Sequence, residues 1–118
     1  MYYVRKTLEI AGSHHLEVPY ETKCARTHGH NWIITIYCKA KELNSDGMVV
    51  DFSKIKSLIF DALDHKDLNE VLGFNPTSEN IARWIVDSIP ECYRADVQET
   101  SSNLAVYVDE SCTDTVGL

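Results

Sequence analysis

Three absences narrow what this chain of 118 residues can be. It has no apolar run long enough to cross a membrane, because charged or polar residues interrupt every hydrophobic stretch. Its first segment, MYYVRKTLEI, lacks the apolar core of a secretory signal, so we expect none. Basic residues are scarce, with 11 Lys and Arg against 18 Asp and Glu, and the net charge of −7 disfavours nucleic acid as the main partner. We therefore expect a cytoplasmic protein that binds neither membrane nor nucleic acid, and an anionic small molecule is a possible partner if a metal or a few local cations receive it.

Paired cysteines are also absent. The four cysteines contain no CxxC pair, and their spacings of 14, 54 and 20 residues do not resemble a compact disulfide scaffold. Without an export signal, we expect four reduced thiols in a reducing cytosol. A thiol of this chain is therefore available to bind a metal or to react.

Hydrophobic periodicity predicts a single α+β domain. Alternating apolar residues indicate strands, and apolar residues three and four apart indicate helices. The order along the chain is strand, strand, helix, helix, strand, strand, which favours helices on one face of an antiparallel sheet. The expected strands cover residues 2–10, 30–41, 95–99 and 103–108. We assign residues 1–108 to the domain and residues 109–118 to a polar tail.

Each expected helix has a capping signal and an apolar side. Asp51 or Ser53 is available as the N-cap of the first helix. The second has Thr77 or Ser78 as its cap, and Pro90 ends it. The expected apolar sides are Phe52, Ile55, Leu58, Ile59, Ala62 and Leu63 on the first helix, and Ile81, Trp84, Ile85 and Ile89 on the second.

The stretch CARTHGHNW concentrates the residues most able to do chemistry. His28 and His30 are two residues apart on a segment that runs into a strand, and this spacing aims both imidazoles at the same face. They share that face with Trp32, so it is the less hydrated one. His-x-His on a strand is a common zinc arrangement, although histidines that merely hydrogen-bond to backbone or carboxylates would have the same spacing.

A catalytic zinc ion needs three protein ligands and one open position. Two candidates for the third ligand follow the first strand, His14 and His15. Extending the alternation of this strand from Leu8 through Ile10 places His14 on the inner side, whereas His15 points away. His14 is therefore the candidate for the third ligand, and His15 is expected at the surface.

Cys24 lies in the loop that enters the histidine segment, between Lys23 and Arg26. Nearby cations favour thiolate over thiol and so increase reactivity. Cys24 is either a reactive thiolate or a fourth zinc ligand. The short loop to His28 and the need for a vacant position for substrate both weigh against ligation.

Two carboxylates complete the set of candidates. Asp64 precedes His65 at the end of the first helix, where a carboxylate can orient an imidazole as a proton shuttle. A cationic histidine at a helix C-terminus is the alternative interpretation. Glu99 shares a strand side with Val97, and an inward carboxylate needs a partner. That partner is either a salt bridge or a ligand with two parallel N–H donors, such as the guanidine-like edge of a purine or pterin.

These segments together resemble the 6-pyruvoyltetrahydropterin synthase family, and within it the carboxytetrahydropterin subgroup. The spacing Cys-x-x-x-His-Gly-His is the specific part of the resemblance. The matching stretches come in the family's order up to about Tyr107 and are SHHL, CARTHGHNW, GMVVDFSKIK, LDHKDLNE, NPTSENIARWI and VQETSSNLAVY. The resemblance implies the tunnelling fold, a four-stranded antiparallel sheet with two helices on one side, whose subunits join as trimers into a barrel and stack as a hexamer.

The resemblance also implies roles for the candidate residues. His14, His28 and His30 match the zinc ligands. Cys24, Asp64 and His65 match the catalytic group, and Glu99 matches the carboxylate that anchors the pterin ring. The implied reaction converts 7,8-dihydroneopterin triphosphate to 6-carboxy-5,6,7,8-tetrahydropterin, releasing acetaldehyde and triphosphate, as an early step toward 7-deazapurines such as queuosine. A 6-pyruvoyltetrahydropterin synthase and a non-catalytic zinc module are the alternatives.

Overall fold

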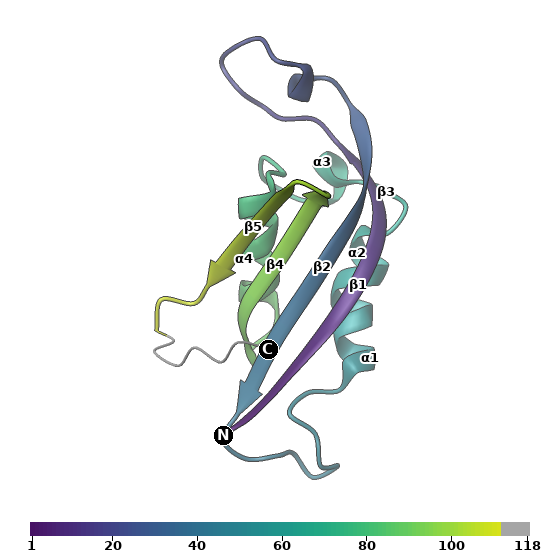
Figure 1. Cartoon of the computed structure of the whole chain (residues 1–118). Coiled ribbons are helices and arrows are strands. Elements are labelled where there is room, and N and C mark those ends of the chain that lie inside the picture. The colour runs from purple at the N-terminus through teal and green to yellow at the C-terminus, as the bar shows by residue number, and fades with distance from the viewer. Residues whose placement is uncertain (112–118) are drawn as a thin grey trace.

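A five-stranded sheet forms the centre of the fold in the computed structural model, which describes residues 1–111 (Figure 1). The strand order across the sheet is β3-β1-β2-β4-β5. Neighbouring strands are antiparallel except β3, which is parallel to β1. The strands are β1 (Tyr2–His14), β2 (His28–Ala40), β3 (Lys66–Asp67), β4 (Cys92–Thr100) and β5 (Asn103–Val108).

The predicted α+β class is confirmed, but the expectation of a four-stranded, wholly antiparallel sheet is wrong by one strand. The additional strand, β3, has only two residues, and it adds to the free edge of β1 through the pairs Gly12 with Lys66 and Ser13 with Asp67. Two residues are too few to show the alternation from which a strand is predicted. The sheet is therefore mixed.

The longest ladder in the sheet joins β1 to β2. It runs in unbroken register from Tyr2 opposite Ala40 to His14 opposite His28. Alternate residues of both strands, including Ile10, Trp32 and Ile34, are buried. In Figure 1 the helices lie behind the sheet, and the buried strand residues pack with buried helix residues in a single core. This ladder sets which side chains at its end face the core.

The first predicted helix is present, but its buried side differs from the predicted one. It comprises α1 (Phe52–Ile55), the π-helical segment η2 (Lys56–Phe60) and α2 (Asp61–Leu63). The Asp51 side chain caps it by accepting from the backbone N–H of Ser53 at 2.9 Å. Phe52 and Leu58 are exposed. Ile55, Ile59 and Leu63, at spacings of four residues, face the core, and the π turn between Ile55 and Leu63 departs from the regular helical periodicity used for the prediction.

The second predicted helix is α4 (Ser78–Ser88), which follows the short helix α3 (Leu68–Val71). Thr77 is its cap and accepts from the backbone N–H of Asn80 at 3.1 Å. Ile81, Ile85 and Ile89 are buried, as predicted. No helix within residues 1–111 is both long and apolar enough to span a membrane.

The segment that joins β1 to β2 extends beyond the end of the sheet, as the purple and blue part of Figure 1 shows. It contains one short helical turn, η1 (Lys23–Ala25), capped by Thr22. At the other end of the chain, β5 stops at Val108, the residue at which the predicted domain ends. Residues 112–118 of the predicted tail lie outside the described residues.

Candidate metal centre

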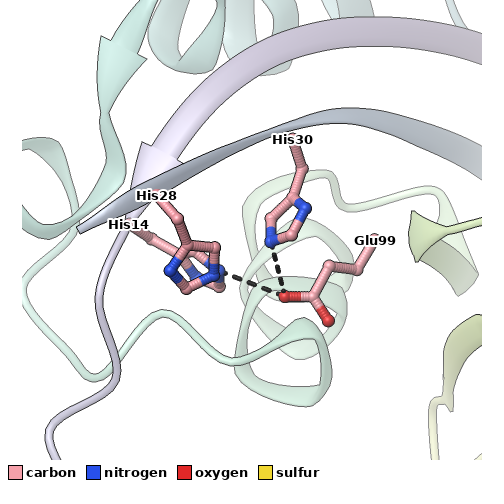
Figure 2. A group of neighbouring side chains, drawn as sticks. All are labelled: His14, His28, His30 and Glu99. Atoms are coloured by element: carbon pink, nitrogen blue, oxygen red, sulfur yellow. Dashed lines mark ion pairs between the residues drawn. The ribbon is translucent and has the colours of Figure 1, made fainter. Parts of the chain in front are cut away.

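Four side chains converge where the β1–β2 ladder ends. His14, His28, His30 and Glu99 each offer one ligand atom, and these atoms all lie within 4.8 Å of one another. Figure 2 shows the three imidazoles grouped around one oxygen of the carboxylate. Nitrogen and oxygen donors gathered this closely could hold a metal ion.

The sheet register explains why these side chains meet. His14 is the last residue of β1 and His28 the first of β2, and the two are directly opposite each other in the ladder. His30 is two residues further along β2 and so faces the same side. Glu99 comes from the next strand, β4, at a register shift between Gln98 and Thr100. Three strands therefore supply the cluster.

Backbone carbonyl groups fix the orientation of two of the imidazoles. His14 Nδ1 donates to the Pro76 carbonyl at 2.8 Å, and His28 Nδ1 donates to the Arg26 carbonyl at 2.6 Å. Because a carbonyl oxygen can only accept, these Nδ1 atoms carry the protons. Nε2 of each neutral ring then presents a lone pair, which is the usual arrangement of a metal-binding histidine.

The facing nitrogens lack ordinary partners. Among residues 1–111, His14 Nε2 and His30 Nε2 are buried and have no hydrogen-bond partner. They lie 3.1 and 3.0 Å from Glu99 Oε1, close enough for ion pairs but only if a ring is protonated. Burial lowers the pKa of His30, although the Glu99 charge opposes this effect. A buried polar atom without a partner is costly, and a metal ion would satisfy both nitrogens.

Two other candidate residues lie outside this cluster. The backbone N–H of His15 donates to Asn69 Oδ1 at 2.8 Å, and its ring lies beside the same asparagine. Cys24 is exposed in η1, and its carbonyl accepts from the Leu16 N–H at 2.7 Å. Within the part of the chain that the structure describes, the thiol is not among the converging ligand atoms.

Asp64 and His65 form a separate pair on the edge of β1. Asp64 Oδ2 lies 2.7 Å from His65 Nδ1, and Asp64 Oδ1 accepts from the Ala11 N–H at 2.9 Å. The His65 N–H returns to the Ala11 carbonyl at 2.7 Å. The Ala11 hydrogen bond, aided by that to His65, lowers the pKa of Asp64. These contacts hold the carboxylate ionised and the imidazole in a fixed orientation.

His65 has an uncommon backbone conformation. Its φ of 58° makes it the one non-glycine residue with positive φ among residues 1–111. Histidine tolerates this region better than most residues, but the conformation still costs free energy. The side chain is 82% exposed. The strain thus presents an imidazole to solvent and buries little of it.

Two clefts are each lined by a member of the cluster. A cleft of about 500 Å³ is lined by both His30 and His65, so it connects the cluster to the Asp64–His65 pair. A second cleft, of about 470 Å³, is lined by Glu99 together with Ser78 and Asn103. The sequence alone did not indicate Pro76 or the second cleft. Both depend on where the start of α4 packs, and only NPTSEN, interpreted as a loop and helix start, marked the region.

Known proteins resemble the chain over nearly its whole length. The family model for 6-pyruvoyl tetrahydropterin synthase matches residues 3–116. A Synechocystis protein named 6-carboxy-5,6,7,8-tetrahydropterin synthase is 35% identical, with 91% of this chain and 93% of the relative covered. The Bacillus subtilis protein of the same name is 29% identical, with coverages of 88% and 83%. The structure of Caenorhabditis elegans 6-pyruvoyl tetrahydropterin synthase matches at 25% identity with a TM-score of 0.73, covering 92% of this chain and 96% of that one.

Proposed function

Because the chain belongs to the 6-pyruvoyl tetrahydropterin synthase family, we propose that it is a zinc-dependent lyase making 6-carboxy-5,6,7,8-tetrahydropterin. Its substrate is 7,8-dihydroneopterin triphosphate, and its other products are acetaldehyde and triphosphate. The names of the Bacillus and Synechocystis relatives support this product over others of the family. The spacing of Cys24, His28 and His30 supports it as well. The reaction belongs to a cytoplasmic route toward 7-deazapurines such as queuosine.

The observation that carries the proposal is the cluster of imidazoles with unpartnered Nε2 atoms. His14, His28 and His30 are the proposed zinc ligands, and neutral imidazoles are suitable donors for that ion. When bound, zinc would supply Lewis acidity to the oxygen atoms of the substrate side chain. The carbonyl groups of Pro76 and Arg26 keep two of the rings in the tautomer that this role needs.

Proton transfer is assigned to Cys24, Asp64 and His65. Asp64 holds the proton of His65 at Nδ1, so the exposed Nε2 is free to accept or return a proton. Nε2 can serve a substrate in the 500 Å³ cleft, which His65 lines. Cys24, which lies between Lys23 and Arg26 in the sequence, is the proposed base. The same cations and Lys66 are candidates for neutralising the triphosphate.

Glu99 is the proposed anchor of the pterin ring. A carboxylate accepts two parallel N–H bonds, which the guanidine-like edge of a pterin provides. Glu99 lines the 470 Å³ cleft, which offers space beside the cluster for such a ring. Anchoring the ring there would fix the substrate side chain relative to the histidines.

The proposed assembly is a hexamer of two stacked trimers, with active sites between subunits. Exposed apolar side chains on β5, the edge strand, are consistent with burial in an assembly: Leu104, Val106 and Val108. The exposed position of Cys24 is consistent with a thiol that works with residues of a neighbouring chain. Sedimentation equilibrium of the full chain tests this part of the proposal, and a monomer at micromolar concentration would contradict it.

Product analysis of the zinc-loaded protein tests the proposed reaction. Incubation with 7,8-dihydroneopterin triphosphate should release acetaldehyde and leave a 6-carboxy pterin. A 6-pyruvoyl product without acetaldehyde would favour the activity named for the Dictyostelium discoideum relative, which is 31% identical. Cys24→Ala should abolish turnover and leave the zinc content unchanged. Loss of zinc from this variant would instead make the thiol a ligand.

A further inference from the structure

A hydrogen bond to His14 does not explain the position of Glu99. Its Oε1 lies 3.1 Å from His14 Nε2, and the proton of that ring is on Nδ1, where it meets the Pro76 carbonyl. Two acceptors therefore face each other, and His30 Nε2 approaches the same oxygen at 3.0 Å. Lone pairs so close repel unless a cation lies between them. Ligand atoms of a tetrahedral zinc site are separated by about 3.3 Å for bonds near 2.0 Å, so these spacings suit a shared metal ion.

We propose that Glu99 is the fourth ligand of the resting metal centre and that the pterin substrate releases it. This inference rests on the proposed function, since the release requires a pterin. It adds to the anchoring role a second state of the same carboxylate. In the resting state Glu99 closes the coordination sphere, and in the bound state it holds the pterin and leaves a position open.

Charge favours the resting ligation. A divalent ion held by three neutral imidazoles leaves a net charge of +2 in a site where His14 is almost fully buried. One carboxylate reduces that charge to +1 and satisfies an oxygen that would otherwise be desolvated beside the rings. The Glu99 side chain is 22% exposed, so it is partly dehydrated in this position.

The backbone at Glu99 allows the carboxylate to move. Gln98 pairs with Leu104 and Thr100 pairs with Asn103, so Glu99 is the additional residue of a β-bulge. A bulged residue is not held in the regular ladder. The cleft of about 470 Å³ begins at this side chain and is also lined by Ser78. A pterin in this cleft would offer paired N–H donors to the carboxylate and so replace the metal as its partner.

Zinc affinity tests the resting half of the proposal without any substrate. Glu99→Gln keeps the size of the side chain and removes its charge, and zinc affinity measured by competition with a chelator should fall at least about 10-fold. Glu42→Gln is the matched control, because Glu42 is exposed and belongs neither to this cleft nor to the cluster. Unchanged affinity in the Glu99 variant, with circular dichroism showing native fold, would overturn the proposal.

Cobalt substitution tests the release. The visible absorption of Co²⁺ depends on its ligands, so adding neopterin, which carries no triphosphate, should change the spectrum of the native chain and of Glu42→Gln. Glu99→Gln should have a different spectrum from the start and should not change further. If equilibrium dialysis shows that neopterin binds the native chain but its cobalt spectrum stays the same, the carboxylate is not released and the proposal fails.

Failure of the proposed function gives a different result. If the protein binds neopterin with the expected spectral change but forms no 6-carboxy pterin from the triphosphate, the reaction is misassigned and the exchange of Glu99 stands. If neopterin does not bind at all, the release by pterin is overturned together with the proposed substrate class. The zinc affinities of the native chain and of Glu99→Gln would then show only whether Glu99 binds the metal, and not whether a pterin releases it.

Discussion

The metal cluster and the Asp64–His65 pair both depend on β1, yet they differ in almost every physical respect. Ala11, which holds Asp64, and His14 are three residues apart, or about 10 Å along an extended strand. His14 is buried and its ring is fixed by a carbonyl group. His65 is 82% exposed, and its ring lies against the neighbouring carboxylate of Asp64.

This difference separates what one chain can complete from what it cannot. The cluster draws its four members from three strands of the same sheet, so folding alone brings them together. The Asp64–His65 pair and Cys24 expose their reactive atoms, and no contact among the described residues unites them. In the proposed function, the folded subunit by itself holds the metal, whereas catalysis requires the substrate and a neighbouring subunit to complete the site.

The largest expected effect comes from removing a cluster histidine. His14→Ala should lower zinc affinity by at least about 100-fold, more than the loss of an outer hydrogen-bond partner, because it removes a proposed donor directly. Chelator competition measures the affinity. His15→Ala is the control, since His15 lies beside Asn69 and outside the cluster. Equal losses of zinc affinity in both variants would contradict the assignment of His14, rather than His15, as a ligand.

The second effect should fall on turnover and leave metal binding intact. Asp64→Asn removes the charge that orients His65, and kcat should fall by about 100-fold or more, as expected for a general acid–base residue. Zinc content should not change. Asp61→Asn, an exposed carboxylate in α2, serves as the control. Zinc loss from Asp64→Asn would mean that the pair and the cluster are not independent.

The third effect concerns stability in acid. The pKa of Asp64 is lowered in the folded chain, chiefly by the Ala11 N–H, so the unfolded chain binds a proton more readily. Its stabilising contribution is therefore complete above the unfolded pKa, near 3.9, and is lost as the pH falls through the lower folded value. The difference in free energy of unfolding between the native chain and Asp64→Asn should shrink from pH 5 to pH 3. Urea denaturation measures it, and a constant difference would contradict the assignment.

The smallest effect is expected from removing the cap of α4, which should change zinc binding by the cluster slightly and leave the Asp64–His65 pair unchanged. Thr77→Ala removes the cap of α4 and should lower the free energy of unfolding by about 1 kcal/mol. The preceding residue, Pro76, holds His14, so zinc affinity should fall slightly while the Asp64–His65 pair is unaffected. Thr77→Ser retains a capping hydroxyl and should behave like the native chain. Thermal unfolding and chelator competition provide the two measurements.

Local patterns in the sequence account for much of the fold. The alternation in β1 and β2 and the closing hairpin were predicted, and the observed cap, Asp51, is one of the two residues predicted for it, because each depends on neighbouring residues. The family was predicted from six short stretches and is confirmed by a model that matches residues 3–116. The exposure of Leu58 was not predicted, since a π turn leaves no regular mark in a sequence.

In the candidate site, too, features that depend on neighbouring residues were predicted and features that depend on distant parts of the chain were not. Parity along β1 indicated His14 rather than His15, and the structure places His14 in the cluster. An inward Glu99 was also predicted, but its contact with the imidazoles was not. That contact depends on the register between β2 and β4 and on the bulge in the β4–β5 pairing, which are decided by distant parts of the chain. The role of Pro76 was hidden for the same reason.

The unbroken ladder between β1 and β2 has a consequence for how this protein can vary. Inserting or deleting one residue anywhere between Tyr2 and His14 would turn every later side chain of β1 to the opposite face and point the last ring into solvent. The part of the connecting segment before Cys24, residues 15–23, is under no such constraint. We expect natural and engineered changes of length to accumulate in that segment, and the spacing within the two strands to be inherited without gaps.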